Sequence, residues 1–326
     1  MRWESDDRVR NVSKMMVLIV SVCVIAVSSI YYNYKFVRYD SEKIVFGATY
    51  MTMNNSFYKA ITDEIEKQIN DRGDILYTRD PALDVEKQNE QINDLIEMGI
   101  DVLITNPVDY SKVNDSLKKA KAKGIRIIVI DAQLDDDTIA DTTVLSNNYD
   151  AGVQCAKDMM RNLSSAKIVL LKHSAALSSV DRINGFLDTI KDNDNYKVVA
   201  SEECLGQTEV AMPVMMEIID KKIDFDVVMA LNDPSALGAL AAIKDKQINH
   251  EVLVYGVDGS PDMKKLLIDS DEVQGTAAQS PTTMGAKAIE AAYEIVHDEQ
   301  YEKSVVVPVS LITKDNISEY DISGWQ

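Results

Sequence analysis

Cysteine and histidine are scarce in this chain of 326 residues, which contains three of each. The sequence has no CxxC motif and no cluster of cysteine with histidine, so a tetrahedral zinc site is not expected. Cys23 lies inside a long apolar run, and only Cys155 and Cys204 could pair within a folded domain. Isolated cysteines in apolar segments are more often free and packed than bridged. We therefore predict no metal site and no cofactor, and we favour free thiols.

Basic residues are outnumbered as well, since 34 Lys and Arg face 53 Asp and Glu, for a net charge of −19. A nucleic-acid-binding protein needs a basic footprint, so this class is excluded. An acidic balance is typical of a well-solvated surface. The hydrophobic fraction of 46% is enough for one large domain or two medium ones.

Catalytic motifs are also missing, because the sequence contains no GxSxG, HExxH or GxxxxGK[ST] pattern. His250 and His297 lie in polar segments and are expected at the surface. His173 follows a strand-like run and could face a cleft, but a polar loop position is the simpler interpretation. No pair of a base and a nucleophile is evident, so the sequence predicts a protein that is not an enzyme. An enzyme of sugar metabolism is kept only as a remote alternative.

One long apolar run, residues 15–32, has no charged residue. As a helix it would be about 27 Å long, at ~1.5 Å per residue, which is just enough to span a bilayer. Arg and Lys residues in the flank 1–14 predict that this flank stays in the cytoplasm. The run is therefore predicted to be a transmembrane signal anchor, followed by a connector at 33–42 and a domain outside the membrane.

Two other fates of the apolar run remain open. Ala26-Val27-Ser28 is a passable signal-peptidase site. Val20-Ser21-Val22-Cys23 resembles a bacterial lipobox weakly, because Val22 is large for the position before the cysteine. All three fates export the rest of the chain.

Strands and helices are predicted to alternate from residue 44 onward. On the first helix, an apolar side chain recurs every four residues from Phe57 through Ile69 and marks one face. Such alternation predicts an α/β fold with parallel, doubly wound sheets. The acidic stretch 135–143 lacks periodicity and is expected to cross from a first lobe to a second. The predicted strands cover 44–48, 74–77, 102–105, 127–130, 167–171, 197–201, 227–231, 252–257, 273–278 and 305–312.

A β-α-β pattern occurs twice and supports two related lobes. In one copy a strand ends at Asn106 and the next at Asp131, 25 positions later; in the other, Asn232 and Asp258 are 26 positions apart. Ligands of open α/β sheets bind at the carboxyl ends of the strands. We therefore expect a cleft between the lobes with an amide and a carboxylate on each side.

Several further residues complete a candidate set for a neutral sugar. Vicinal hydroxyls need planar, bidentate partners, and the apolar face of a sugar ring needs an aromatic face. Phe57 and Tyr58 open the first helix beside Asn55, Arg182 opens a later helix, and Gln279 follows a strand. Each has an ordinary alternative, such as a core position for Phe57, a surface ion pair for Arg182 or a helix cap for Asn232.

With these motifs, the chain resembles the type I periplasmic sugar-binding proteins, closest to the ribose-binding branch, from about residue 44 to 312. The resemblance implies two Rossmann-like lobes joined by three hinge crossings, a first lobe of 43–146 plus 280–309, and a second of 147–279 plus 310–326. It also implies the ligand contacts. The motifs that carry it are 54-NNSFY-58, 104-ITNP-107, 129-VID-131, 181-DRINGF-186, 232-NDPSALG-238, 256-GVDGSP-261 and 278-AQ-279. The implied contacts are Asn55, Phe57, Tyr58, Asp131, Arg182, Asn232, Asp258 and Gln279, with Asn106 a less certain one.

Two departures from the family pattern concern the ligand. Relatives that bind ribose usually have an arginine after the aspartate, where this chain has Ala132, and the aromatic expected near Leu205-Gly206 is absent. We therefore expect a monosaccharide or derivative other than plain ribose.

The resemblance implies that the closed form is presented to the permease of an ABC importer. A membrane sensor, such as a histidine kinase or chemoreceptor, is the alternative partner, and a retained anchor would suit it. Regulators resembling the lac repressor share the fold, but they carry a helix-turn-helix where this chain has its apolar run.

Overall fold

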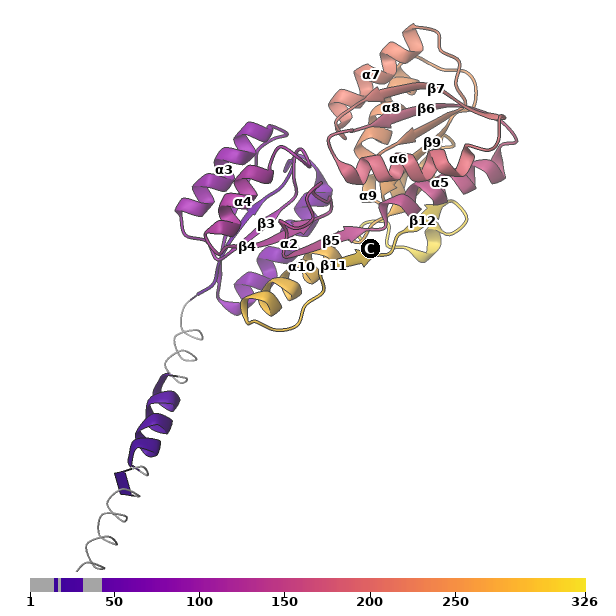
Figure 1. Cartoon of the computed structure of the whole chain (residues 1–326). Coiled ribbons are helices and arrows are strands. Elements are labelled where there is room, and N and C mark those ends of the chain that lie inside the picture. The colour runs from indigo at the N-terminus through magenta and orange to yellow at the C-terminus, as the bar shows by residue number, and fades with distance from the viewer. Residues whose placement is uncertain (1–14, 17–18, 32–42) are drawn as a thin grey trace, which may run out of the picture. The chain divides into compact units, whose positions relative to one another are not determined.

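A computed structural model describes residues 15–16, 19–31 and 43–326, which fall into two units, Met1–Ile44 and Val45–Gln326 (Figure 1). In the first unit, residues 19–31 are helical and exposed. The flank 1–14, the connector 33–42 and residues 17, 18 and 32 of the predicted anchor lie outside the described residues. Among those described, no helix is both long and apolar enough to cross a membrane.

The second unit contains two six-stranded sheets, each defining a lobe. The sheet of the first lobe has the order β11-β5-β4-β3-β1-β2 and is parallel throughout. The sheet of the second lobe has the order β12-β10-β9-β8-β6-β7, with only β12 antiparallel. The predicted α/β class with two doubly wound lobes is confirmed.

The first lobe places helices on both faces of its sheet (Figure 1). Helices α2 and α10 pack together on one face, and α3 and α4 pack together on the other. Its elements are β1 (Val45–Thr49), α2 (Ser56–Arg72), β2 (Ile75–Arg79), α3 (Val85–Glu97), β3 (Val102–Thr105), α4 (Asn114–Ala122), β4 (Arg126–Ile130), β5 (Thr142–Ser146), α10 (Pro281–Val296) and β11 (Ser304–Val307).

The second lobe repeats this plan. Helices α5 and α6 cover one face, while α7, α8 and α9 cover the other. Its elements are α5 (Asn148–Asn162), β6 (Ala166–Lys172), α6 (Leu177–Ile190), β7 (Tyr196–Glu203), α7 (Thr208–Asp220), β8 (Val227–Ala230), α8 (Asp233–Asp245), β9 (Leu253–Asp258), α9 (Pro261–Asp269), β10 (Val273–Ala278), β12 (Ser310–Thr313) and a short 3₁₀ helix (Ile317–Glu319).

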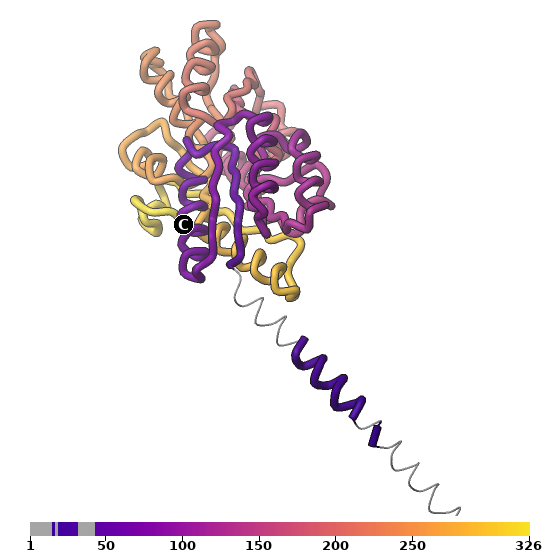
Figure 2. The backbone as a smooth tube through the Cα atoms, turned by 90° about the vertical axis from the view of Figure 1, so that its left-hand side faces the viewer, coloured from indigo at the N-terminus to yellow at the C-terminus, as the bar shows by residue number. Residues whose placement is uncertain are grey.

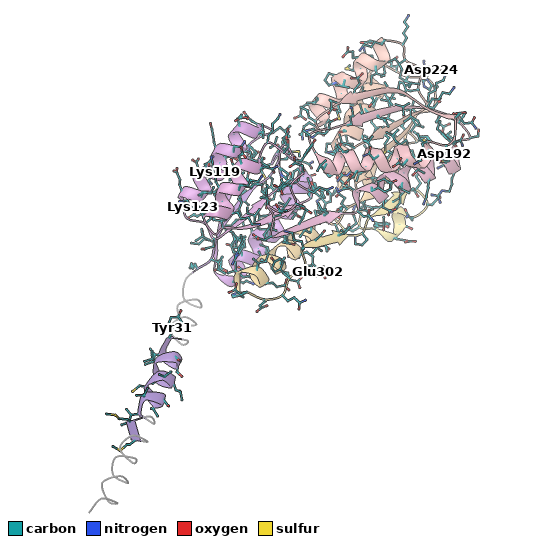
Figure 3. All side chains as sticks on the ribbon, viewed as in Figure 1. Tyr31, Lys119, Lys123, Asp192, Asp224 and Glu302 are labelled. Atoms are coloured by element: carbon teal, nitrogen blue, oxygen red, sulfur yellow. The ribbon has the colours of Figure 1, made fainter. Side chains whose placement is uncertain are left out.

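Local signals explain the helix ends nearest the cleft. The side chain of Asn55 accepts a hydrogen bond from the Phe57 amide and caps α2, which ends at Gly73 in a left-handed conformation, φ 79°. The apolar face predicted for α2 is buried through Ile69. Charged side chains point outward instead, as Lys119, Asp192 and Asp224 show in Figure 3.

The chain passes between the lobes at three places, from β5 to α5, from β10 to α10 and from β11 to β12. Two predictions of connectivity are wrong. The stretch 135–143 does not cross between lobes, because it leads into β5, which pairs with β4 in the first sheet. The single strand predicted at 305–312 is two strands in different sheets, because Pro308 lacks an amide hydrogen and interrupts the run.

Candidate functional site

The carboxyl ends of strands from both sheets meet around one cavity. The cavity is narrow, with a volume of about 30 Å³. Since one water needs about 10–15 Å³ by that measure, the lobes stand close together here. A molecule as large as a monosaccharide therefore requires the walls to part.

Asp131 supplies the carboxylate of the first lobe. It follows β4 in a left-handed conformation, φ 69°, which is uncommon for a residue with a side chain. Its Oδ2 accepts hydrogen bonds from the Tyr58 hydroxyl at 3.0 Å and from Asn106 Nδ2 at 3.4 Å. Its Oδ1 is buried and has no hydrogen-bond partner among the described residues.

Asp258 supplies the matching carboxylate of the second lobe. It ends β9 and also has a positive φ, 141°. Its Oδ1 accepts a hydrogen bond from Gln279 Nε2 at 2.8 Å. The carbonyl oxygen of that amide, Gln279 Oε1, is a second buried acceptor without a partner in the part of the chain that the structure describes.

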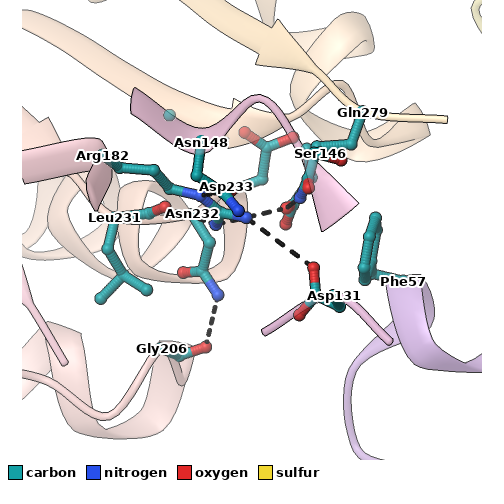
Figure 4. Close-up of polar contacts among 12 residues, drawn as sticks. Phe57, Asp131, Ser146, Asn148, Arg182, Gly206, Leu231, Asn232, Asp233 and Gln279 are labelled. Carbon is teal, nitrogen blue, oxygen red and sulfur yellow. Dashed lines mark hydrogen bonds and ion pairs between the residues drawn. The ribbon is translucent and has the colours of Figure 1, made fainter. Parts of the chain in front are cut away.

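Arg182 pairs with both carboxylates, and Figure 4 shows it reaching toward Asp131. Its Nη2 is 4.0 Å from Asp131 Oδ1 and its Nη1 is 4.0 Å from Asp258 Oδ1, so both contacts are ion pairs too long to be hydrogen bonds. Nε donates to Asn148 Oδ1 at 2.8 Å and Nη1 donates to the Leu231 carbonyl at 2.9 Å. The guanidinium is thus fixed on one side and keeps further N–H donors toward the cavity.

Two asparagines line the cavity while capping helices. Asn232 accepts from the amide of Ser235 at 3.0 Å and caps α8, and its Nδ2 donates to the Gly206 carbonyl at 3.0 Å. Asn55 caps α2 in the same way. Asn232 therefore has the helix-capping role that was its alternative to ligand binding. The second N–H of its side-chain amide can still donate to a ligand.

Aromatic and apolar side chains form another wall. Phe57 meets Tyr58 edge-on with ring centroids 5.6 Å apart, and meets Trp325 edge-on at 5.9 Å. Met51 and Leu205 also line the cavity. Such a surface suits the C–H face of a sugar ring.

Hydrogen bonds across the rim join the lobes. Gln133 Nε2 donates to Asp181 at 3.2 Å, and Asn54 Nδ2 donates to Glu209 at 3.1 Å. The amide of Tyr110 donates to the Ala175 carbonyl at 3.3 Å. The Asn54–Glu209 bond is exposed, so it contributes little stability and is easily exchanged for water.

The structure brings most of the predicted site residues together. The cavity lining includes every predicted residue except Asn106, which is wholly buried behind Asp131. Asn106 holds the loop after β1 through the Met51 amide at 3.2 Å, so it positions the site without lining it. The residues that do line it are Asn55, Phe57, Tyr58, Asp131, Arg182, Asn232, Asp258 and Gln279.

Some lining residues were not predicted. His173 was expected in a polar loop, but it is buried at the end of β6 and faces the cavity. Gln207 and the turn at Leu205-Gly206 follow β7. The convergence of strand ends had allowed a cleft position for His173 without selecting it, and the same rule could have found Gln207.

Burial governs the charges in the site. It raises the pKa of Asp131, with Arg182 opposing the shift, and it raises the pKa of Asp258 well above its ordinary value, with the nearby carboxylate of Asp233 adding to the shift. Burial lowers the pKa of His173, so its imidazole is neutral at neutral pH. The cavity therefore presents one fixed cation beside carboxylates that need a hydrogen-bond donor.

Cysteines and clusters of metal-ligating residues do not contribute to the site. Cys155 and Cys204 are buried and free, as favoured from the sequence. Across residues 15–16, 19–31 and 43–326, no three His, Cys, Asp or Glu side chains are grouped as a metal site.

Comparisons with known proteins agree with this geometry. The family model described as "Periplasmic binding protein domain" matches residues 46–300. The ribose import binding protein of Bacillus subtilis is 30% identical over 277 residues, which cover 84% of this chain and 89% of that protein. The ribose import binding protein of Escherichia coli is 28% identical over 266 residues, covering 81% and 88%.

Solved structures share the fold. An ABC transporter solute-binding protein from Mycobacterium smegmatis with bound glycerol is 29% identical, has a TM-score of 0.80, and the match covers 85% of this chain and 96% of that one. One from Bacillus halodurans with bound myo-inositol has the same TM-score at 23% identity, covering 86% and 98%.

Proposed function

Because this chain belongs to the family of periplasmic sugar-binding proteins, which are extracytoplasmic, we propose that it captures a monosaccharide or sugar-like polyol between its lobes. It releases the molecule unchanged, since relatives of this family are solute-binding proteins rather than enzymes. The molecules named for relatives, ribose, myo-inositol and glycerol, all carry vicinal hydroxyls.

The observation that carries the proposal is that two buried acceptors in the cavity lining, Asp131 Oδ1 and Gln279 Oε1, have no hydrogen-bond partner among the described residues. Buried polar atoms are normally hydrogen-bonded, and an unpaired one costs about 1–3 kcal/mol. Hydroxyl groups of a polyol would donate to both acceptors and accept from the free N–H groups of Arg182. One ligand would then connect the carboxylate of Asp131 in the first lobe with Gln279 and Arg182 in the second lobe.

Such a ligand stabilises the closed arrangement of the lobes. Opening would break its bonds to Asp131 on one side and to Gln279 on the other, in addition to the contacts that the ligand-free protein already makes between the lobes at the rim, at Arg182–Asp131 and at Phe57–Trp325. Binding therefore shifts the population toward the closed form.

We propose further that plain ribose is not the preferred ligand. Ala132, at the position where ribose-binding relatives have an arginine, is buried and does not line the cavity. Among the described residues that line it, Arg182 carries the one guanidinium group. A binding site with a second arginine would donate another fork of hydrogen bonds. Hexoses, cyclitols or substituted sugars are expected to compensate for the absence of those hydrogen bonds through additional contacts with the apolar wall around Met51.

The partner that reads the closed form is proposed from the family. The permease of an ABC importer is the first candidate, because the relatives from Bacillus subtilis and Escherichia coli are import binding proteins. A membrane-bound sensor is the second, and the apolar run 15–32 favours it if that run is retained as an anchor. Fractionation separates the fates: a retained anchor leaves full-length protein in the membrane fraction, where protease reaches the domain in wall-free cells without lysis.

A thermal-shift screen of the purified protein against pentoses, hexoses, cyclitols and sugar alcohols tests the proposed function. A compound at 100 times its dissociation constant stabilises the folded protein by about 2.7 kcal/mol, which is readily measured. The proposal fails if no compound in this panel raises the melting temperature. The statement about ribose fails separately if ribose binds more tightly than every other compound.

A further inference from the structure

We propose that residues 321–326 support the aromatic wall of the sugar site from behind, and that Trp325 is a positioning residue that holds Phe57 and stabilises the closed form. This inference rests on the proposed function. The segment is bound to the second lobe and contacts Phe57 in the wall of the first lobe, although none of its residues lines the cavity.

Partly buried hydrogen bonds attach the segment to the second lobe. Lys264 is fully buried in α9, and its ammonium donates to the backbone carbonyls of Asp321 and, at 2.7 Å, Gly324. The side chain of Gln326 donates to the Gly259 carbonyl at 3.0 Å. A β-carbon on Gly259 would lie 2.6 Å from Gln326 Oε1, so this glycine, at φ 69°, lets the segment approach.

The attachment point adjoins the cavity, because Gly259 directly follows Asp258. From there the half-buried Trp325 reaches across to the first lobe, where its ring meets Phe57 edge-on with centroids 5.9 Å apart and planes at 71°. Figure 2 shows the end of the chain, in yellow, beside the indigo and purple segments of the first lobe.

The contact couples closure to the shape of the aromatic wall. Phe57 belongs to α2 of the first lobe and lines the cavity, whereas Trp325 is fixed to the second lobe. Separation of the lobes breaks the ring pair, and closure forms it again. The pair therefore favours the closed form and orients the ring of Phe57 toward the sugar face.

The test compares Trp325→Ala, Trp325→Phe and the control Ile322→Ala, an exposed position in the same segment. Each full-length variant is titrated with D-ribose, myo-inositol and xylitol by calorimetry. An edge-on aromatic pair contributes about a 2- to 12-fold change in an equilibrium constant. Trp325→Ala should therefore bind about 2- to 12-fold more weakly through faster dissociation, Trp325→Phe should recover most of the affinity, and Ile322→Ala should match the parent.

A second measurement needs no change in the segment. The chain has two tryptophans, at positions 3 and 325, so Trp3→Phe leaves Trp325 as the single reporter. Its emission should change when a bound polyol closes the lobes. The inference is overturned, while the proposed function stands, if Trp325→Ala binds with unchanged affinity. It is also overturned if the fluorescence of Trp325 does not change when a polyol binds. Failure of all three compounds to bind the parent overturns both.

Discussion

The exchange of Asp131 for asparagine isolates what its carboxylate does for binding. Position 131 has a φ of 69°, and asparagine tolerates this left-handed conformation better than alanine would. The amide oxygen of the new side chain can still accept from Tyr58 and Asn106, which now hold Oδ2. The change therefore falls on the other atom, where an NH₂ group replaces Oδ1, which faces Arg182 and accepts no hydrogen bond from the described residues.

The expected loss follows from that single atom. A hydrogen bond from a ligand hydroxyl to a charged acceptor contributes about 1.5–3 kcal/mol, so Asp131→Asn should weaken binding by roughly 10- to 150-fold. The unliganded protein should not suffer, because burial already disfavours the charge of Asp131. Its melting temperature should stay within about 3 °C of the parent, which corresponds to roughly 1 kcal/mol.

Calorimetric titration with the best compound of the screen, together with melting curves without ligand, gives both quantities. Asp192→Asn is the matched control, since this carboxylate is exposed at the outer surface of the second lobe and is not part of the cavity lining (Figure 3). Undiminished affinity in Asp131→Asn would refute a ligand-binding role. A fall of the unliganded melting temperature by about 10 °C or more would show instead that the carboxylate serves the fold.

Three more substitutions test the electrostatics and the packing. Burial and the neighbouring Asp233 raise the pKa of Asp258, so the folded state binds the proton of this carboxyl group more tightly than the unfolded state does. The protonated group therefore contributes stability at low pH, and this contribution is lost as the pH rises from the ordinary value of 3.8 through the folded pKa. Asp258→Asn should therefore be more stable than the parent at neutral pH, and urea unfolding across pH should show the difference shrinking toward pH 3.8; a difference that grows toward acid pH contradicts this. Gly152→Ala would place a β-carbon 1.8 Å from the carbonyl oxygen of Arg182, where backbone cannot move aside, and should cost about 3 kcal/mol or more in the free energy of unfolding. Gly73→Ala, with no atom within 4 Å of its added carbon, should cost only about 1–2 kcal/mol for its left-handed conformation, and equal costs at both glycines would contradict the packing argument.

Strand ends were the part of the site that the sequence revealed best. An apolar run that stops at a polar residue marks the carboxyl end of a parallel strand, and such ends converge. This rule, applied together with the family resemblance, selected Asp131, Asn232 and Asp258, and all three line the same cavity. For β6 the rule allowed a cleft position for His173, but a polar loop was preferred; the rule was not applied to β7, so Gln207 was missed.

Other features depend on distant contacts that a local pattern does not contain. β5 has a buried and half-buried alternation, but only its pairing with β4 and β11 shows that the chain returns to the first sheet before crossing. Asn106 has the residue type of a ligand contact, yet its amide is used by the backbone of the loop after β1. The role of Trp325 could not be predicted from the sequence, because its contact partner Phe57 is far away along the chain.

The burial of two thiols makes this protein suitable for site-specific chemical labelling. Burial raises the pKa values of Cys155 and Cys204, and the thiolate is the reactive form, so maleimide dyes should leave both untouched at neutral pH. Cys23 is exposed and would be changed to serine. A single cysteine introduced at Glu209, where the rim bond to Asn54 opens and closes, could then carry an environment-sensitive dye. The chain would become an optical biosensor for whichever polyol closes its lobes.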